Sequence, residues 1–413
     1  MTSVAALQLL WRLATGGLAL LTALLVSVNL GLPTQGVVAT SMSVVIGLSV
    51  LTGSGFMHAA AFLSARRPDE AGTLGRQTAL VTLGTGTVVG VLAALIGPRV
   101  APTLPVLWWH IALALPFIQL AQLCLGLQQG LGRSRAYVAI YVTQPVAAFV
   151  LAVIGSLLAA ASEQPSDWAG PIITAPFILQ GLLSAFGLLR LPRRAEDDEV
   201  RTVLSYTARI YPSAVAHYLS YRLDLILVSA LLGSRAAGLY SLALNGVDAV
   251  ARVGQTAATV LFRRFSEADL RRGVALARRS AIYAGALSLI AGVLLAALIS
   301  LLGDLGSDIQ VLGRLMFILS VGGGAISAWT VLAAYLAAND RLAAAARVNI
   351  VLLALSLSCY VLLIPIIGVY GGAIGTSVGL AAAGWLGYRE VGRVRSEPGG
   401  DSLAALLRNP FGK

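Results

Sequence analysis

The sequence predicts an all-α membrane protein that crosses the lipid bilayer about twelve times. Of its 413 residues, 57% are hydrophobic and only 11% are charged, whereas soluble domains carry about 25% charged residues. The apolar runs continue for about 20 residues or more, which is the length that a helix needs to cross the hydrocarbon core. Because a transmembrane β-barrel would show shorter segments of alternating polarity, these runs predict helices.

Short connections that contain glycine, proline or charged residues separate the apolar runs. The predicted spans cover residues 5–31, 37–63, 74–97, 104–128, 137–161, 168–190, 208–232, 236–262, 275–302, 309–337, 345–366 and 368–389.

The basic residues predict the orientation of these spans. If the N-terminus is cytoplasmic, 22 of the 29 basic residues fall on cytoplasmic connections and the tail, against Arg99, Arg235 and Arg314 outside. Such an excess follows the positive-inside rule and explains the net charge of +11 without a nucleic-acid partner. All basic residues except Lys413 are arginine, which suggests a GC-rich bacterial genome. We therefore expect a bacterial cytoplasmic (inner) membrane protein with both termini cytoplasmic.

An internal repeat relates the two halves of the chain at an offset of 202 residues. Leu-Gly, four residues and a second Gly occur at 30–36 after the first span and again at 232–238 after the seventh. Gly170 before span six likewise corresponds to Gly372 before span twelve. Six spans in each half give a parallel repeat, which is typical of transporters with a site between their halves.

Several motifs resemble a known family. Three stretches resemble the seventh and eighth spans of Wzx-type polysaccharide flippases. They are Arg222-Leu223-Asp224-Leu225-Ile226-Leu227-Val228, Leu231-Leu232-Gly233 and Ala237-Gly238-Leu239-Tyr240-Ser241. These proteins belong to the multidrug/oligosaccharidyl-lipid/polysaccharide exporter (MOP) superfamily. Gly130-Leu131-Gly132-Arg133 and the stretch 368–376 fit as well, whereas Arg263 stands where the family often has Pro. The likeness covers nearly the whole chain.

The resemblance implies two six-helix bundles around a central cavity. The expected parts are an N-terminal bundle (1–191), a cytoplasmic linker (192–207), a C-terminal bundle (208–390) and a cytoplasmic tail (391–413). It also implies a flippase, not an enzyme. The cargo would be an undecaprenyl-pyrophosphate-linked oligosaccharide (an O-antigen, capsule or exopolysaccharide unit), moved across the membrane by alternating access.

The expected partners are the lipid-linked oligosaccharide and membrane lipids, with the polymerase and glycosyltransferases of the same pathway as further candidates. No cofactor or metal is expected, and coupling to protons or sodium ions stays open. Cys124 and Cys359 lie inside apolar runs and offer no disulfide framework.

Four charged residues lie within the predicted spans seven and eight: Arg222, Asp224, Asp248 and Arg252. A charge at membrane depth is costly, so it usually faces a cavity or a partner. Arg222 and Arg252 are candidates to bind the pyrophosphate, because a guanidinium donates in bidentate fashion to phosphate oxygens. Asp224 and Asp248 are candidates for ion coupling or for Arg–Asp pairs that lock the helices together.

Further candidates lie in spans one, two, seven and ten. Arg12 in span one either faces the cavity, as basic residues of that span do in related flippases, or extends to the cytoplasmic surface. His58 and His217 are either coupling groups or packing residues. Gly322, Gly323 and Gly324 in span ten form either a hinge or a close helix contact.

Rival functions differ in what the sequence should contain. An ATP-driven exporter would need a phosphate-binding loop of the form G-x4-G-K-[ST], which this sequence lacks. A membrane glycosyltransferase or ligase would place charged residues on substantial outer loops, and here these loops are short and nearly uncharged. An ion-coupled multidrug exporter (MATE-like) remains the main alternative, although its cavity should be acidic or aromatic.

Overall fold

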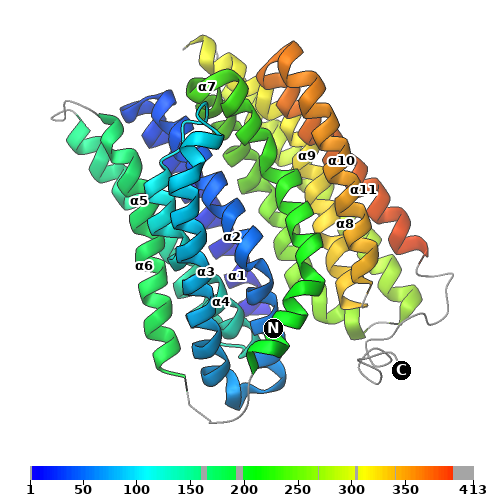
Figure 1. The fold of residues 1–413 in the computed structure, drawn as a ribbon. Coiled ribbons are helices and arrows are strands. Elements are labelled where there is room, and N and C mark those ends of the chain that lie inside the picture. The colour runs from blue at the N-terminus through cyan, green and yellow to red at the C-terminus, as the bar shows by residue number, and fades with distance from the viewer. Residues whose placement is uncertain are drawn as a thin grey trace. The chain divides into compact units, whose positions relative to one another are not determined.

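A computed structural model describes residues 2–159, 165–191, 199–267, 269–302, 306–339 and 341–393, and every regular element in these ranges is a helix (Figure 1). The long helices are α1 (Thr2–Leu25, continued by the π-helix Val26–Leu30), α2 (Leu32–Arg66), α3 (Ala71–Val100), α4 (Trp108–Gly130), α5 (Ser134–Ala159), α6 (Ala169–Leu189), α7 (Glu199–Glu267), α8 (Leu270–Leu301), α9 (Ser307–Ala338), α10 (Leu342–Ile367) and α11 (Val369–Arg393).

The helices correspond to the predicted spans, and α7 contains two of them. Eleven helices of the described chain are long and apolar enough to cross a membrane, and the one in α7 extends over 49 residues, Ala214–Phe262. Gly233 interrupts α7 with φ 84° and ψ 177°, so the helix is kinked there. The prediction of an all-α polytopic membrane protein is therefore confirmed.

The chain forms two compact units. One unit contains Gly17–Asn245, and the other contains Met1–Gly16 together with Gly246–Lys413. We refer to them as the 17–245 unit and the 246–413 unit, the latter including residues 1–16. The predicted bundles, 1–191 and 208–390, remain a prediction. Within the predicted linker, residues 199–207 already belong to α7, while 192–198 and the tail residues 394–413 lie outside the described residues.

In the 17–245 unit, α4 packs against α2, α3 and α6. Its side chains Ile111, Leu115, Leu123 and Leu127 are fully buried, because α4 has neighbours on several sides. Close contacts depend on small residues, and a Cβ on Gly86 of α3 would lie 2.7 Å from the Cα of Pro116 on α4. Without a hydrophobic driving force between helices in lipid, this close packing supplies the association.

In the 246–413 unit, α9 occupies the corresponding position and packs along α8 and α11, while α10 packs on α11. Trp329 and Tyr335 of α9 are fully buried. The indole Nε1 of Trp329 donates to the side-chain oxygen of Asn349 on α10 at 3.2 Å. A buried polar group costs free energy unless it is bonded, and this bond satisfies the indole inside the unit.

Candidate functional site

The two glycine hairpins (residues 30–36 and 232–238) have the same backbone geometry. Gly31 has φ 92° and Gly233 has φ 84°, a region that side chains with a Cβ rarely adopt. Each glycine turns the chain directly before a new helical segment. The repeat found in the sequence is therefore a structural repeat as well.

The second glycines of the two hairpins bring these hairpins into direct contact inside the 17–245 unit. A Cβ on Gly36 would overlap the carbonyl oxygen of Ser234, and a Cβ on Gly238 would overlap the carbonyl oxygen of Leu32. Ser234 lies 202 residues after Leu32, as Gly238 lies 202 after Gly36. The contact is thus reciprocal, as expected for two copies of one motif that meet around a local two-fold axis.

Polar side chains hold α2 against α7 on either side of this contact. The Thr40 hydroxyl donates to the Ser229 hydroxyl at 2.9 Å, and the Gln35 amide donates to the Ser241 hydroxyl at 3.1 Å. Farther along α7, the Tyr218 hydroxyl donates to the main-chain carbonyl of Ser43. The first half of α7 therefore lies antiparallel to α2, in the unit formed by Gly17–Asn245.

Asp224 is fully buried and lies before the α7 kink. Its Oδ1 accepts from the main-chain N–H of Leu225 and its Oδ2 from the Tyr240 hydroxyl, each at 2.7 Å. Because Tyr240 follows the kink at Gly233, the bond closes the second glycine hairpin. This geometry gives the Asp224 carboxylate a structural contact with Tyr240, and both the Arg–Asp pair and the coupling role stay predictions.

Arg222 and His217 lie around Tyr221 on the same part of α7. The Arg222 guanidinium carbon is 5.0 Å from the centre of the Tyr221 ring. The His217 ring stacks on the same tyrosine at 6.3 Å between centroids and 6° between planes. Arg222 is half-buried and His217 is exposed. These residues form a cationic and aromatic surface on α7, and their role in transport stays a prediction.

Arg12 and Arg252 come together in the 246–413 unit, on a seam between the start of α1 and the second half of α7. Nη1 of Arg252 donates to the Thr15 hydroxyl at 3.1 Å, and Nη2 of Arg12 donates to the Thr259 hydroxyl at 3.1 Å. Thr15 in turn donates to the main-chain carbonyl of Arg12 at 3.0 Å. We call this arrangement the arginine seam.

Gly16 allows Arg252 to lie across α1. A Cβ on Gly16 would stand 2.9 Å from both Cδ and Nε of Arg252, so a larger residue would push the guanidinium away. Asp248 is half-buried one helical turn before Arg252, as the spacing of four residues predicts. Its role in ion coupling stays a prediction.

The other candidates stand as follows. The side chain of His58 lies outside the described residues.

Gly322, Gly323 and Gly324 lie inside the unbroken helix α9, and each faces a different helix. The nearest atoms to an added Cβ would be Ser377 Cα of α11 (3.2 Å), Val247 Cγ1 of α7 (2.5 Å) and Gly285 O of α8 (2.9 Å), respectively. These contacts support close packing, and the hinge stays a prediction.

The sequence pattern does not single out Thr15, Thr259 or Tyr240, the polar partners of the candidate charges. Residues 252, 256 and 259 follow helical spacing, as do 12, 15 and 16, and this periodicity could have indicated two facing stripes. Within the described residues, no three His, Cys, Asp or Glu side chains gather as a metal site.

Comparison with known proteins relates this arrangement to a family and to a fold. The family model for "Polysaccharide biosynthesis protein" matches residues 5–269. No curated protein sequence matches the chain.

Solved structures share the fold at low sequence identity. The lipid II flippase MurJ in an inward closed conformation superposes with a TM-score of 0.71 at 12% identity, covering 93% of this chain and 87% of that one. An inward-facing MATE family multidrug resistance transporter gives 0.68 at 13%, covering 95% and 100%. A MOP superfamily transporter from Pyrococcus furiosus gives 0.67 at 14%, covering 95% of both chains.

These similarities agree with the resemblance found in the sequence, since transporters of the MOP superfamily have this helical architecture. Because the family model matches more than half of the chain, this multi-pass membrane protein belongs to the polysaccharide biosynthesis protein family and has the fold of MOP superfamily transporters.

Proposed function

We propose that the protein is a flippase for an undecaprenyl-pyrophosphate-linked oligosaccharide in the bacterial cytoplasmic membrane, with both termini cytoplasmic. The family match and the fold shared with a lipid II flippase support transport of a lipid-linked substrate. The positive-inside pattern of the arginines supports the orientation.

The arginine seam is the observation that carries the proposal. In the contacts described above, Arg12 and Arg252 each donate to a threonine hydroxyl. A hydroxyl satisfies a donor without neutralising the positive charge. Among the described residues, Arg12 makes no ion pair. An anion that reaches Arg12 would therefore gain charge-assisted bonds that a threonine cannot supply.

A diphosphate fits these two guanidinium groups by chemistry and charge. Arginine stays protonated at every physiological pH and presents a planar fork to phosphate oxygens. Exchange of threonine bonds for phosphate bonds would bind the head of the substrate, and return of the threonines would favour its release. Arg222, on the surface next to Tyr221, is a second candidate to contact the diphosphate during its passage.

The reciprocal hairpin contact supports alternating access. Gly36 and Gly238 let the two hairpins meet main chain to main chain, so they are suited to a contact that closes one side of the membrane. In the proposed orientation, that side is the outer one.

The test uses the purified full chain in proteoliposomes with a fluorescent undecaprenyl-pyrophosphate-linked N-acetylglucosamine. A membrane-impermeant quencher reports how fast the label crosses the bilayer. The double change Arg12→Gln and Arg252→Gln should slow crossing about tenfold or more, because each arginine loses bonds to a charged group. Arg222→Gln, tested separately, should cause a smaller decrease.

The matched control is Arg66→Gln with Arg190→Gln, which removes the same charge from exposed arginines that lie over Phe62 and Phe186 at helix ends. It should leave the crossing rate unchanged. Normal crossing in the Arg12/Arg252 variant would exclude the arginine seam from the mechanism. Transport of ethidium without transport of the lipid would instead assign the protein to the multidrug exporters, whose fold it shares.

A further inference from the structure

The end of α11 carries a group of arginines apart from the arginine seam. Arg389 and Arg393 belong to α11, Arg347 comes from α10, and Arg278 comes from α8. We call these four residues the α11 rim. All lie in the 246–413 unit, at the membrane face that the positive-inside pattern predicts to be cytoplasmic.

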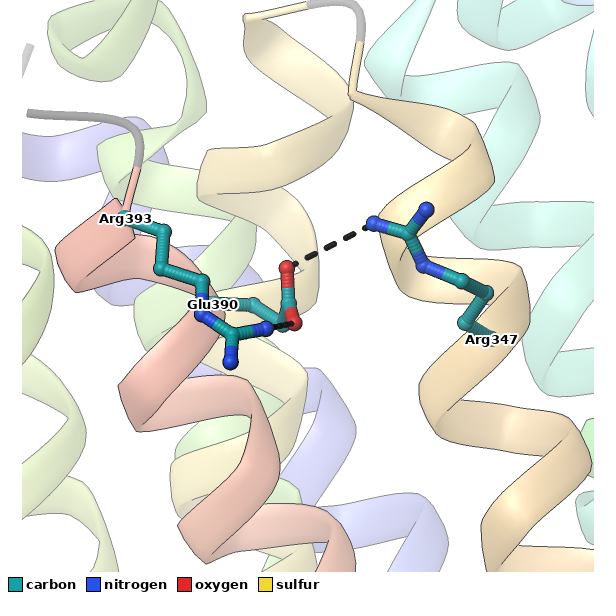
Figure 2. A network of polar contacts seen from close by, with 3 residues as sticks. All are labelled: Arg347, Glu390 and Arg393. Atoms are coloured by element: carbon teal, nitrogen blue, oxygen red, sulfur yellow. Dashed lines mark hydrogen bonds and ion pairs between the residues drawn. The ribbon is translucent and has the colours of Figure 1, made fainter. Parts of the chain in front are cut away.

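Glu390 lies between two of these arginines (Figure 2). Nη1 of Arg393 is 2.6 Å from Oε1 of Glu390, and Nη2 of Arg347 is 3.6 Å from Oε2 of the same carboxylate. The carboxylate therefore faces two guanidinium groups and neutralises one charge. Counted over the four arginines and this carboxylate alone, the charge stays positive.

The two arginines next to Glu390 are accessible. The side chains of Arg347 and Arg393 are 70% and 63% exposed, whereas that of Glu390 is 17% exposed. Exposed ion pairs contribute little to stability, so this network is a weak reason for the arginines to be here. The exposed guanidinium of Arg347 is accessible to a solvent or headgroup environment that can supply an anion.

Aromatic side chains lie under the other two arginines. The guanidinium carbon of Arg389 is 4.7 Å from the ring centre of Trp385, and that of Arg278 is 4.2 Å from the ring of Tyr388. Trp385 and Tyr388 are exposed at 58% and 37%. Tryptophan and tyrosine mark the level of the lipid headgroups, so the rim lies at the depth of lipid phosphates.

An apolar surface continues from the rim into the membrane. Ile350 and Val351 follow Arg347 by about one helical turn on α10 and are 53% and 46% exposed. They offer an apolar surface for an acyl chain below Arg347. A free inorganic anion would need the arginines alone, whereas a phospholipid would use both surfaces.

We propose that the α11 rim binds the phosphodiester headgroup of an anionic membrane phospholipid. Arg347 and Arg393 contact the phosphate, in competition with Glu390, while Trp385, Ile350 and Val351 contact the upper acyl chain. Basic pockets between transmembrane helices on the cytoplasmic side have the chemistry to bind anionic headgroups. This site is separate from the arginine seam and does not depend on the proposed transport substrate.

The experiment measures lipid retention by native mass spectrometry of the purified full chain, after addition of phosphatidylglycerol or phosphatidylcholine with identical acyl chains. The wild-type protein should retain phosphatidylglycerol selectively. The double change Arg347→Gln and Arg393→Gln should weaken this retention about tenfold, because each basic residue near the surface adds attraction for an anionic lipid. Glu390→Gln should strengthen it, since the competing carboxylate is gone.

The control is again Arg66→Gln with Arg190→Gln, which removes two exposed arginines from the same predicted face. An equal loss of phosphatidylglycerol in this control would show bulk surface charge and overturn the proposal. Weaker retention of phosphatidylglycerol in Glu390→Gln would overturn the proposal too. That result is expected if Glu390 only holds the arginines in place. Displacement of the lipid by millimolar inorganic phosphate would assign the rim to free anions instead. Size-exclusion profiles verify that each variant is folded.

Discussion

Arg76 on α3 and Arg278 on α8 are 202 residues apart and make equivalent contacts in the two halves of the chain. Nη2 of Arg76 donates to the main-chain carbonyls of Leu189 and Leu191 at 3.0 and 3.2 Å, at the end of α6. Nη2 of Arg278 donates to the carbonyl of Tyr388 at 3.0 Å, near the end of α11. In each half, an arginine thus donates to main-chain carbonyls near the end of the last helix of that half.

The candidate charged residues within the predicted spans have no such counterparts in the other half of the chain. At the offset of 202 residues, Arg12, Arg222, Asp224, Asp248 and Arg252 correspond to Ala214, Leu20, Thr22, Ile46 and Val50. Gly31, Gly36 and Arg76, in contrast, have identical counterparts. The comparison teaches that the repeat preserves the turns and helix-end contacts, whereas none of the candidate charged residues has a charged counterpart in the other half. A single asymmetric set of charges suits a single substrate better than two equivalent sites would.

The largest expected effect concerns the most symmetric feature, the hairpin contact. Gly36→Ala and Gly238→Ala should each destabilise the protein by about 3 kcal/mol, because the added Cβ overlaps main-chain atoms that cannot rotate away. Reversible unfolding in mixtures of sodium dodecyl sulfate and mild detergent measures the free energy.

The double variant should cost less than the sum, because both glycines serve one contact. Gly84→Ala is the control, since a Cβ there would meet nothing within 4 Å. Unequal single effects, or strict additivity, would break the proposed two-fold equivalence of the hairpins.

A smaller effect concerns the carboxylate of Asp224, which has no counterpart in the other half of the chain. Tyr240→Phe removes a donor from the buried Asp224 and should cost about 2 kcal/mol, because a bond to a charged group is lost. The matched control is Tyr360→Phe, whose hydroxyl is 3.0 Å from the Thr376 hydroxyl across the same separation of 16 residues. Its loss should cost about 1 kcal/mol, as for a neutral pair. Equal losses would indicate that the Asp224 carboxylate carries no charge in the folded protein.

The next effect tests whether Arg76 and Arg278 are equivalent. Arg76→Ala and Arg278→Ala should each cost about 1–1.5 kcal/mol, because each leaves main-chain carbonyls with fewer donors. The same unfolding measurement applies to both, and transport of the fluorescent lipid should persist. Arg264→Ala, an exposed arginine on α7, is a suitable control. A loss in only one half would show that the framework is less symmetric than the contacts indicate.

The smallest effect separates packing from hinge motion in α9. Gly323→Ala brings a Cβ to 2.5 Å from Cγ1 of Val247, a side-chain end that can shift, so we expect a cost of about 1 kcal/mol. Under the packing interpretation, stability falls and the remaining folded protein transports normally. Unchanged stability with slower transport would instead favour the hinge that the triple glycine first suggested.

Much of the fold could be predicted because each span is a local property of the chain. The predicted span 309–337, for example, became α9 (Ser307–Ala338), and 368–389 became α11 (Val369–Arg393). The join between spans seven and eight was harder to predict. Two helical segments meet there at a single non-helical residue, Gly233, where the predicted spans left residues 233–235 as the connection.

The candidate site could be predicted only in part, because partners come from distant segments. The charges at 12, 222, 224, 248 and 252 are visible in the sequence as exceptions within apolar runs. Their contacts are not: Thr259 lies 247 residues from Arg12, and Thr15 lies 237 residues from Arg252. Likewise, the Gly-x4-Gly motif indicates a turn, but nothing in either copy shows that the two copies touch.

The sequence by itself determined that the chain spans a membrane as helices and that its halves repeat. Both follow from local physics, since lipid offers no partner to an open backbone and a positive φ selects glycine. Only the tertiary structure decided which charges are buried, which donors they meet and which glycines lie against a carbonyl. Those properties depend on how each helix is rotated, and its rotation is set by packing against helices far away in the sequence.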